Sequence, residues 1–356
     1  MRTVLWWGRF DADYSRNRIL RGLLADLGWR VIDFHPRFSS LADWEARLRK
    51  LPHPDLVWVP CFRQRDLAAA NRWARSNHIP LLFDPLISAY DKQVFERGKI
   101  PPDSAKARRL LARETRLFQL ADCILADTEE HARYFRETFH VASERIHVVY
   151  VGAEEALFTP SEPRQKSPGE PLEALFYGSF IPLQGAPVII EAARRYAGPP
   201  LRWILIGSGP ELAQCKCSAS GLSNVTFEPW VNYADLPARI RHADILLGVF
   251  GTTQKAGRVI PNKVYQALAC GRPVVTRHSE AYPATVTART DAALSWVESG
   301  DPSNLAEEVA KLAQHLADRP DAGRCASELY LAAFSNTVIR DQLFGALAAI
   351  HGLRSR

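Results

Sequence analysis

The chain has 356 residues, more than twice the usual size of a single domain, so two domains are expected. Hydrophobic residues make up 47% of the sequence and charged residues 24%, proportions that exclude a disordered or collagen-like chain. The 45 basic residues exceed the 39 acidic ones, and the resulting net charge of +6 favours an anionic partner without selecting one.

Targeting signals and metal ligands are not evident. No apolar run approaches the roughly 18 residues that a membrane-spanning helix needs, and the apolar patch at residues 3–7 is too short for a signal peptide. We therefore expect a soluble cytoplasmic protein whose six scattered cysteines are reduced. Cys215 and Cys217 alone offer too few ligands for structural zinc, so no metal site is predicted.

Residues 1–158 alternate short β-rich runs with longer helical patterns. Between the first two strand candidates, Ile19, Leu20, Leu23, Leu24 and Leu27 recur at helical spacing. This βαβ rhythm predicts a parallel, doubly wound sheet in an N-terminal Rossmann-like domain. The expected strands are residues 3–7, 30–34, 55–60, 81–83, 123–126 and 146–149.

Residues 159–172 contain four prolines and predict a linker. The same rhythm resumes over residues 173–335, which predicts a second Rossmann-like domain facing the first across a cleft. The helical tail has no strand left to connect, so we expect it to cross between the domains, with residues 336–356 packing back on the N-terminal domain. The expected strands of the second domain are residues 174–177, 201–206, 224–227, 245–249, 273–276 and 294–297.

The end of the first strand is a candidate ligand site, because ligands of open parallel sheets bind at the carboxyl ends of strands. In WWGRFDADYSRNR, Gly8 precedes a polar loop, and Arg9, Arg16 and Arg18 are available to an anionic acceptor or to a sugar. The alternative is an ordinary turn in which Ser15 caps the next helix and the arginines are solvated. The segment alone does not choose between the two.

Two glycine loops end strands in the second half. YGSFIPLQG places Gly178 and Ser179 at a strand end, and IGSGPEL places Gly207, Ser208 and Gly209 before a helix that is expected to open at Pro210. Such turns can present N–H groups to a base or a phosphate. Each loop is weak evidence alone, because ordinary strand-to-helix connections also use glycine.

A fourth segment, GVFGTTQKAGRVIPNKVYQALACGRPVV, carries the strongest signal. It concentrates Lys255, Arg258 and Lys263 within nine residues, just before and within a helix expected to start near Pro261. Cations at the mouth of a strand and the foot of a helix favour an anion site through charge and helix dipole together. The alternative is a solvated basic loop.

The order of these segments resembles the retaining glycosyltransferases of family 4, which have the GT-B fold of two Rossmann-like domains. ALACGRPVV is close to the family's E-A-M-A-C-G-x-P-V-V, and LFYGSFIPLQG occupies the place of its G-R-L-x-x-x-K-G loop. ILIGSGPEL and VTFEPWVNYADLPARIRHADILL also match. The resemblance implies transfer of a hexose from a nucleotide diphosphate sugar to a hydroxyl of a glycan, lipid-linked sugar or small molecule, with retention of configuration.

Four charged positions of the family's pattern differ in this chain. The arginine and lysine of the glycine loop correspond to Ser179 and Gln184, and the two spaced glutamates correspond to Arg258 and Gln266. One interpretation is a catalytically degenerate binding subunit. The other, which we favour, is relocation of the cations to the basic segment, because a diphosphate without a cation in a dry cleft would be severely destabilised. A nucleotide-sugar epimerase of the same fold is a further alternative.

The resemblance also implies roles for residues of the second domain. Lys255, Arg258 and Lys263 are expected to neutralise the departing diphosphate, so neither a metal ion nor a cofactor is required. Gln266 is expected to face the ribose. The full expected donor-binding set is Gly178, Ser179, Gly207, Ser208, Gly209, Trp230, Val231, Pro261, Asn262 and Gln266.

The first domain is expected to hold the acceptor and part of the sugar. Asp84, in FDPLISAYDK, is the expected catalytic sugar contact, with a turn or helix-cap aspartate as the alternative. Ser88 lies in the same segment. Asp127, at another strand end, fits a helix cap better than a catalytic group.

The segment from Lys92 to Arg116 contains eight basic and three acidic residues. It could bring the protein to the inner face of an anionic membrane that carries a lipid-linked acceptor. A solvated helix face is the favoured interpretation. Nucleic acid is not an expected partner, because the aromatic residues lie in apolar strand patterns and do not alternate with the arginines.

Overall fold

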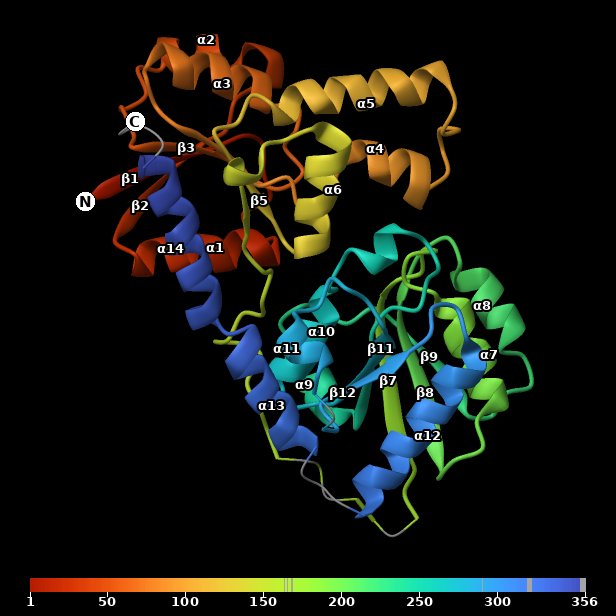
Figure 1. The fold of residues 1–356 in the computed structure, drawn as a ribbon. Helices are drawn as coiled ribbons and strands as arrows, with labels where there is room; N and C mark the ends of the chain where they lie inside the picture. The colour runs from red at the N-terminus through yellow and green to blue at the C-terminus, as the bar shows by residue number, and fades with distance from the viewer. Residues whose placement is uncertain (163, 165, 168, 290, 319–321, 353–356) are drawn as a thin grey trace. The chain divides into compact units, whose positions relative to one another are not determined.

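The computed structural model describes residues 1–356 except 163, 165, 168, 290, 319–321 and 353–356 (Figure 1). The chain divides into two compact units. The first unit is Met1–Val151 with the C-terminal segment that begins at Asn336, and the second unit is Gly152–Ser335. Parts of the expected linker (163, 165 and 168), donor domain (290 and 319–321) and C-terminal helix (353–356) lie outside the described residues.

The first unit is built on a parallel sheet. Its strands are β1 (Arg2–Trp7), β2 (Trp29–Phe34), β3 (Leu56–Val59), β4 (Leu81–Phe83), β5 (Cys123–Ala126) and β6 (Ile146–Val148), in the order β2-β1-β3-β4-β5-β6. Every residue of β3, β4 and β5 is buried, as expected for parallel strands that are covered on both faces.

Helices cover both faces of this sheet. Figure 1 shows α2, α3, α5 and α6 on one face and α1 with α14 on the other. Phe118 of α5 and Phe135 of α6 join the strand residues Val57 and Phe83 in one core. The helical segments are α1 (Ser15–Asp26), η1 (Ser39–Leu41), α2 (Ala42–Leu48), α3 (Leu67–Ser76), α4 (Ala89–Asp91), η2 (Lys92–Glu96), α5 (Ala105–Phe118), α6 (Glu129–Phe139), η3 (Ser143–Arg145) and α14 (Asn336–Gly352).

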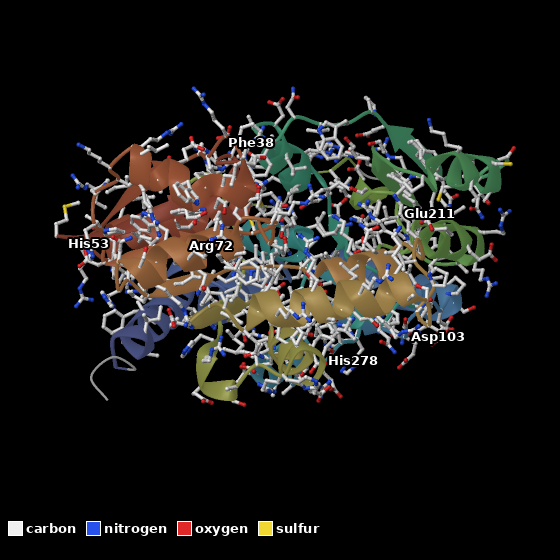
Figure 2. The ribbon with its side chains drawn as sticks, turned by 90° about the horizontal axis from the view of Figure 1, so that it is seen from above. Phe38, His53, Arg72, Asp103, Glu211 and His278 are labelled. Atoms are coloured by element: carbon white, nitrogen blue, oxygen red, sulfur yellow. The ribbon has the colours of Figure 1, made fainter. Side chains whose placement is uncertain are left out.

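Local hydrogen bonds define where these helices begin and how they are joined. The hydroxyl of Ser104 accepts the backbone N–H of Ala107 and caps α5. Arg72 of α3, labelled in Figure 2, donates through Nε and Nη2 to the carboxylate of Asp43 in α2, at 3.0 and 2.7 Å. This forked contact links two helices on the same face of the sheet.

The second unit repeats the architecture with a different strand order. Its strands are β7 (Leu172–Ser179), β8 (Leu201–Ser208), β9 (Val225–Glu228), β10 (Ile245–Leu247), β11 (Val274–Arg277) and β12 (Leu294–Val297), in the order β12-β11-β10-β7-β8-β9. The helical segments are α7 (Ala186–Arg195), α8 (Leu212–Ser218), α9 (Leu236–His242), η4 (Lys255–Gly257), α10 (Asn262–Ala269), α11 (Ala284–Thr287), α12 (Pro302–Asp318) and α13 (Ala322–Ala333).

Apolar helix faces fill the space against this second sheet. Figure 1 shows α7, α8 and α12 on one face and α9, α10 and α11 on the other. Ile189 of α7 and Leu305 of α12 pack with Phe176 of β7 and Trp203 of β8. The order of the sheet reverses between β7 and β10, which is the topological switch point where ligands of such sheets bind.

The α/β fold and its parallel sheets confirm the predicted architecture, and every expected strand forms with its ends shifted by at most two residues. Two local expectations were wrong, and so was the alternative in which Ser15 caps a helix. Ser15 is the first residue of α1 and makes no cap, since Tyr14 precedes the helix without a side-chain capping bond. The helix expected to open at Pro210 begins at Leu212, and Thr128, rather than Asp127, caps α6.

The C-terminal tail is two helices. α13 contacts α10 and α11 of the second unit, whereas α14 contacts α1, β5 and β6 of the first unit. The backbone N–H of Tyr150 also donates to Gln342 of α14 at 3.0 Å. Among the described residues, no helix combines the length and apolar character needed to cross a bilayer.

Candidate active site

The two glycine loops of the second unit lie side by side at neighbouring strand ends. Gly178 pairs with Gly207, and Ser179 with Ser208, in the register of β7 and β8. Gly207 has a φ of +139°, and a Cβ there would lie 1.9 Å from the carbonyl oxygen of Gly178. The structure therefore brings these four predicted residues together, and only glycine allows the approach.

Gly209 continues this close packing. Its φ is +152°, and a Cβ there would lie 2.6 Å from the backbone nitrogen of Phe180. The N–H of Phe180 donates to Ser208 at 2.9 Å, and the N–H of Glu211, labelled in Figure 2, donates to Phe180 at 3.0 Å. The β8 turn is thus held against the β7 loop by backbone contacts on both sides.

The β7 loop also packs against the end of β10. Gly185 has a φ of +68°, and a Cβ there would lie 2.6 Å from the backbone nitrogen of Gly251. The N–H of Phe250 donates to the carbonyl of Gln184 at 3.1 Å. The backbone at the switch point is consequently rigid, which suits a site that must hold a ligand in one position.

Lys263 lies at this switch point, with its side chain buried. Its Nζ donates to Oε1 of Gln184 at 3.1 Å and lies 3.7 Å from the ring centroid of Phe176. Burial lowers the pKa of Lys263 well below its ordinary value, while the aromatic face favours the ammonium form. None of the described residues forms an ion pair with it.

The other two predicted cations lie on the connection from β10 to α10. Lys255 begins η4 and is buried, and Arg258 follows η4 and is half-buried. Pro261 precedes α10 with an extended backbone, and Asn262 is the first residue of the helix. These four residues therefore belong to one continuous segment that leads from β10 into α10, the helix that carries Lys263.

Sequence reasoning missed Arg277. It ends β11, the strand beside β10, and its Nη1 donates to the carbonyl of Gly251 at 2.7 Å. A Cβ on Gly257 would lie 3.4 Å from Nη2 of the same guanidinium. Burial lowers the pKa of Arg277. Its position directly after the apolar run PVVT was the signal that could have found it.

Gln266 and the β9 connection complete the expected donor set. Oε1 of Gln266 accepts the hydroxyl of Tyr177 at 2.8 Å, so this amide oxygen already has a partner. Trp230 lies in the loop after β9 and is 65% exposed, and Val231 beside it is half-buried. β9 is the edge strand, two strands from β7, so these two residues are on the far side of β8 from the switch point.

In the first unit, Arg16 and Asp84 form a fully buried ion pair. Nε of Arg16 lies 2.8 Å from Oδ2 and 3.0 Å from Oδ1 of Asp84, and both side chains have 0% exposure. Nη1 of Arg16 donates to the carbonyls of Val149 and Tyr150 at 3.0 and 3.3 Å. Burial raises the pKa of Asp84, and Arg16 opposes this shift. Neither side chain reaches the surface, so the structure gives each a partner inside the protein.

The other expected site residues near the end of β1 differ in their exposure to solvent. Gly8 is buried with a φ of +134°, and a Cβ there would lie 2.9 Å from Asp66, which pairs with Arg63. Arg9 is exposed, and Arg18 is half-buried with Nη1 3.9 Å from Asp13. Of the three arginines expected to be available, Arg16 is therefore not accessible.

Ser88 and Asp127 are also buried and paired. The hydroxyl of Ser88 donates to Glu114 at 2.6 Å and accepts the N–H of Asp91, which makes Ser88 the cap of α4. The carboxylate of Asp127 contacts Nδ1 of His131 one turn into α6. Neither residue is open to a ligand in this arrangement.

The described residues contain no cluster of three or more histidine, cysteine or carboxylate side chains that could hold a metal ion. Cys215 is buried and Cys217 exposed, and both are free thiols. The chemistry that the second unit can offer is therefore a rigid glycine-rich backbone with cations beside it.

Two family models match the chain. The model described as a glycosyl transferase 4-like domain matches residues 6–152, and the model described as glycosyl transferases group 1 matches residues 171–315. D-inositol 3-phosphate glycosyltransferase 1 of Catenulispora acidiphila is 25% identical over 321 residues, which cover 82% of this chain and 74% of that protein.

The D-inositol 3-phosphate glycosyltransferase of Mycobacterium marinum is 25% identical over 234 residues, which cover 61% of this chain and 47% of that protein. The chain spans about half the length of the mycobacterial relatives that it matches.

Solved structures share the fold at low sequence identity. Sucrose-phosphate synthase from Thermosynechococcus elongatus superposes with a TM-score of 0.73 and 16% identity, over 99% of this chain and 100% of that one. HepE of Anabaena in complex with UDP superposes with a TM-score of 0.70 and 15% identity, over 98% and 100%. The chain therefore belongs to the glycosyl transferases group 1 family, and its two Rossmann-like units have the GT-B fold.

Proposed function

We propose that the protein transfers a hexose from a nucleotide diphosphate sugar to an acceptor hydroxyl, with retention of configuration and without a metal ion. The observation that carries this proposal is the 3.1 Å contact between Nζ of Lys263 and Oε1 of Gln184. Gln184 corresponds to the loop lysine of the family's pattern. An ammonium group from α10 therefore occupies the neighbourhood in which the family places its loop cation.

Lys263 is suited to a ligand that brings negative charge. Among the described residues, the buried ammonium is compensated by Gln184 and by the rings of Phe176 and Tyr177, and no carboxylate pairs with it. A diphosphate placed beside Nζ would stabilise the protonated lysine, and the lysine would stabilise the charge that develops on the departing diphosphate. Each such charge-assisted contact contributes about 1.5 to 3 kcal/mol.

The remaining donor contacts are proposed at the same edge of the sheet. Gly178 and Gly207 let the ends of β7 and β8 pack directly against each other. Arg258, which follows η4, and Arg277, which ends β11, are further cations on the connections after β10 and β11. The proposed reaction breaks the bond between the anomeric carbon and the β-phosphate oxygen. It forms a bond from that carbon to the acceptor oxygen on the same face, and the acceptor proton passes to the leaving diphosphate.

Asp84 and Arg16 act as positioning residues in this proposal. Their buried pair joins the start of α1 to the end of β4 and to the carbonyls that follow β6. It would hold three connections at the carboxyl edge of the first sheet, where the family binds the acceptor and part of the sugar. This replaces the sugar contact expected of Asp84, because its carboxylate is not accessible.

Thermal shift measurements with UDP, GDP, ADP, CDP and dTDP in EDTA test the donor site, since a ligand of the native state raises the melting temperature. UDP is the first choice, because HepE of Anabaena was solved with UDP and with UDP-glucose. We expect one nucleotide to stabilise the wild type and the control Lys311→Met, but not Lys263→Met. A shift that persists in Lys263→Met would contradict the relocated cation.

Activity measurements separate the enzyme from a binding subunit. We expect Lys263→Met to lower kcat/KM for donor turnover by about 100-fold, which corresponds to about 2.7 kcal/mol and is within the range of one charge-assisted contact in the transition state. NMR of the product should show the anomeric configuration of the donor. A nucleotide shift without any sugar transfer would favour a catalytically degenerate subunit, and conversion of the free donor sugar would favour an epimerase.

A further inference from the structure

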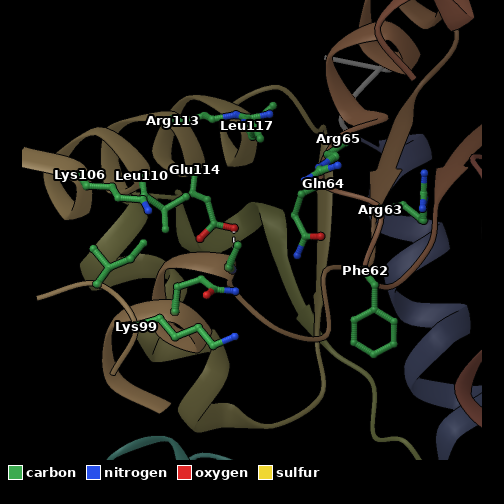
Figure 3. Close-up of a pocket in the computed structure, with 13 residues that line it drawn as sticks. Phe62, Arg63, Gln64, Arg65, Lys99, Lys106, Leu110, Arg113, Glu114 and Leu117 are labelled. Atoms are coloured by element: carbon green, nitrogen blue, oxygen red, sulfur yellow. Dashed lines mark hydrogen bonds between the residues drawn. The ribbon is translucent and has the colours of Figure 1, made fainter. Parts of the chain in front are cut away.

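The first unit contains a cavity that the donor site does not use. It has a volume of about 780 Å³ and lies between the loop after β3, the segment around α4 and η2, and helix α5. Figure 3 shows Lys99, Lys106 and Glu114 on one side and Gln64 with Phe62 on the other. We call it the α5 pocket. Its size falls within the range of small-molecule sites.

The lining of the α5 pocket is strongly basic. It includes the five cationic side chains Arg63, Arg65, Lys99, Lys106 and Arg113, with Glu114 as the one acidic residue. Arg63 is paired with Asp66. The other four cations form no ion pair within the described part of the chain, so positive charge in the pocket is left uncompensated.

Glu114 does not neutralise these cations. Its carboxylate accepts the hydroxyl of Ser88 at 2.6 Å and the backbone N–H groups of Ala89 and Tyr90 at 2.9 and 2.7 Å. The side chain is 2% exposed. Its acceptor capacity is thus directed at the turn that begins α4, and it shapes the wall of the pocket.

The pocket also has a constrained wall at the carboxyl edge of the sheet. Nε2 of Gln64 donates to the carbonyl of Ile87 at 2.7 Å, which joins the loop after β3 to the loop after β4. Phe62 and Leu86, in these same loops, have left-handed φ values of 65° and 56°. Strain of this kind in non-glycine residues is found mostly at functional sites.

We propose that the α5 pocket binds the phosphate of a phosphate-bearing acceptor. Several guanidinium and ammonium groups that line one concave surface can bind a phosphate together. A neutral sugar would leave their charge uncompensated. This inference rests on the proposed function for its acceptor role, and on the cavity and its charges for its chemistry. A sugar phosphate and the diphosphate head of a lipid-linked sugar share that chemistry.

Binding is tested on the full chain with and without a saturating concentration of the nucleotide that stabilises it in the thermal shift measurements, so that phosphate binding at the donor site is separated from binding in the α5 pocket. Isothermal titration with pyrophosphate compares the wild type with Lys99→Ala/Arg113→Ala, and with the control Arg109→Ala/Arg116→Ala. The control removes the same charge from exposed positions of α5 outside the pocket. We expect saturable binding that the pocket variant weakens at least 10-fold and the control less than 2-fold. No saturable binding, or equal losses in both variants, would overturn the proposal.

Transfer assays then compare a neutral sugar, the same sugar as a phosphomonoester, and the sugar linked to a prenyl diphosphate. We expect a phosphorylated acceptor to be used at least 10-fold more efficiently, with KM for that acceptor raised in the pocket variant and donor KM unchanged. Preference for the monoester or the prenyl diphosphate identifies the source. Equal use of the neutral sugar would overturn the proposal. Binding to anionic vesicles is measured for the same proteins, and an equal loss in the pocket variant and in the control variant would also overturn it.

The two proposals fail in different ways. If no acceptor is glycosylated and the donor is not hydrolysed, the proposed function fails, whereas pyrophosphate titration still decides whether the pocket binds phosphate. If transfer occurs and the pocket variant behaves as the control does, the proposed function stands and the pocket is rejected.

Discussion

The two units share a sheet of six parallel strands, but they treat charge differently at the carboxyl ends of those strands. In the first unit, Arg16 pairs with Asp84 and Arg63 pairs with Asp66, so these two arginines are compensated inside the protein. In the second unit, Lys263 lies beside glycine loops with an amide and an aromatic ring as its partners. The shared fold therefore gives both units the same kind of strand edge, whereas the partners of the charged side chains at that edge differ.

The location of uncompensated charge differs as well. In the second unit it lies at the switch point of the sheet, next to backbone that only glycine can form. In the first unit it lies away from the Arg16 pair, where α5 faces the loop after β3. Four changes test this comparison.

Gly207→Ala should have the largest effect. A Cβ there would lie 1.9 Å from the carbonyl oxygen of Gly178, at a φ of +139°. Backbone on both sides must move, so we expect the free energy of unfolding to fall by more than about 4 kcal/mol. Limited proteolysis and thermal denaturation should show loss of the second unit. A variant with unchanged stability would mean that the two loops are not in contact.

The buried pair of the first unit should come next. Arg16→Met leaves the carboxylate of Asp84 buried without its partner, and we expect a loss of about 3 to 5 kcal/mol in urea denaturation. The double variant Arg16→Met/Asp84→Leu should recover part of this loss, because no unpaired charge remains. Recovery would show that apolar side chains can replace the ion pair without loss of folding stability. Absence of recovery would show that the contacts of Arg16 with the backbone carbonyls contribute most of its stabilising effect.

Lys263→Met should have a smaller effect, of opposite sign. Burial lowers the pKa of Lys263 below 10.5, so between the lowered pKa and 10.5 the unfolded chain binds more protons and stability rises with pH. We expect the variant to exceed the wild type by about 1 to 2 kcal/mol at pH 7, with the difference shrinking toward pH 10. Urea denaturation across this range measures it.

Lys311→Met is the matched control for this pH series, because Lys311 is exposed and paired with Glu308. It should show no such convergence with the wild type. A constant difference between Lys263→Met and the wild type from pH 7 to pH 10 would mean that the ammonium of Lys263 is fully compensated in the free protein.

Gly22→Ala should have the smallest effect. Gly22 lies within α1 of the first unit, and a Cβ there would meet nothing within 4 Å. Replacing a helical glycine should raise stability by about 0.5 to 1 kcal/mol. Thermal denaturation of Gly22→Ala beside Gly207→Ala then separates a glycine required by close approach from one that is not.

The sequence alone determined the architecture of this protein. Leu56–Val59 is a short continuous apolar run, which predicts a strand buried on both faces, and the structure buries all of it. The leucines of Ser15–Asp26 recur at helical spacing, which predicts a helix. The glycine loops and the basic segment were also identified, because those signals are contiguous. Cap positions were less certain: Thr128, not the neighbouring Asp127, has the backbone conformation that allows it to cap α6.

Only the tertiary structure decided which charges are available. Arg16 and Asp84 are 68 residues apart, and Gln184 and Lys263 are 79 apart, so no local pattern shows that the first pair is sealed and that the second meets at one strand end. The basic residues of the segment from Lys92 to Arg116 looked alike in sequence, yet some line a cavity and others do not. Helical periodicity predicts on which face of a helix a side chain lies. Its ion-pair or hydrogen-bond partner depends on which strand ends, distant in the sequence, the sheet brings together.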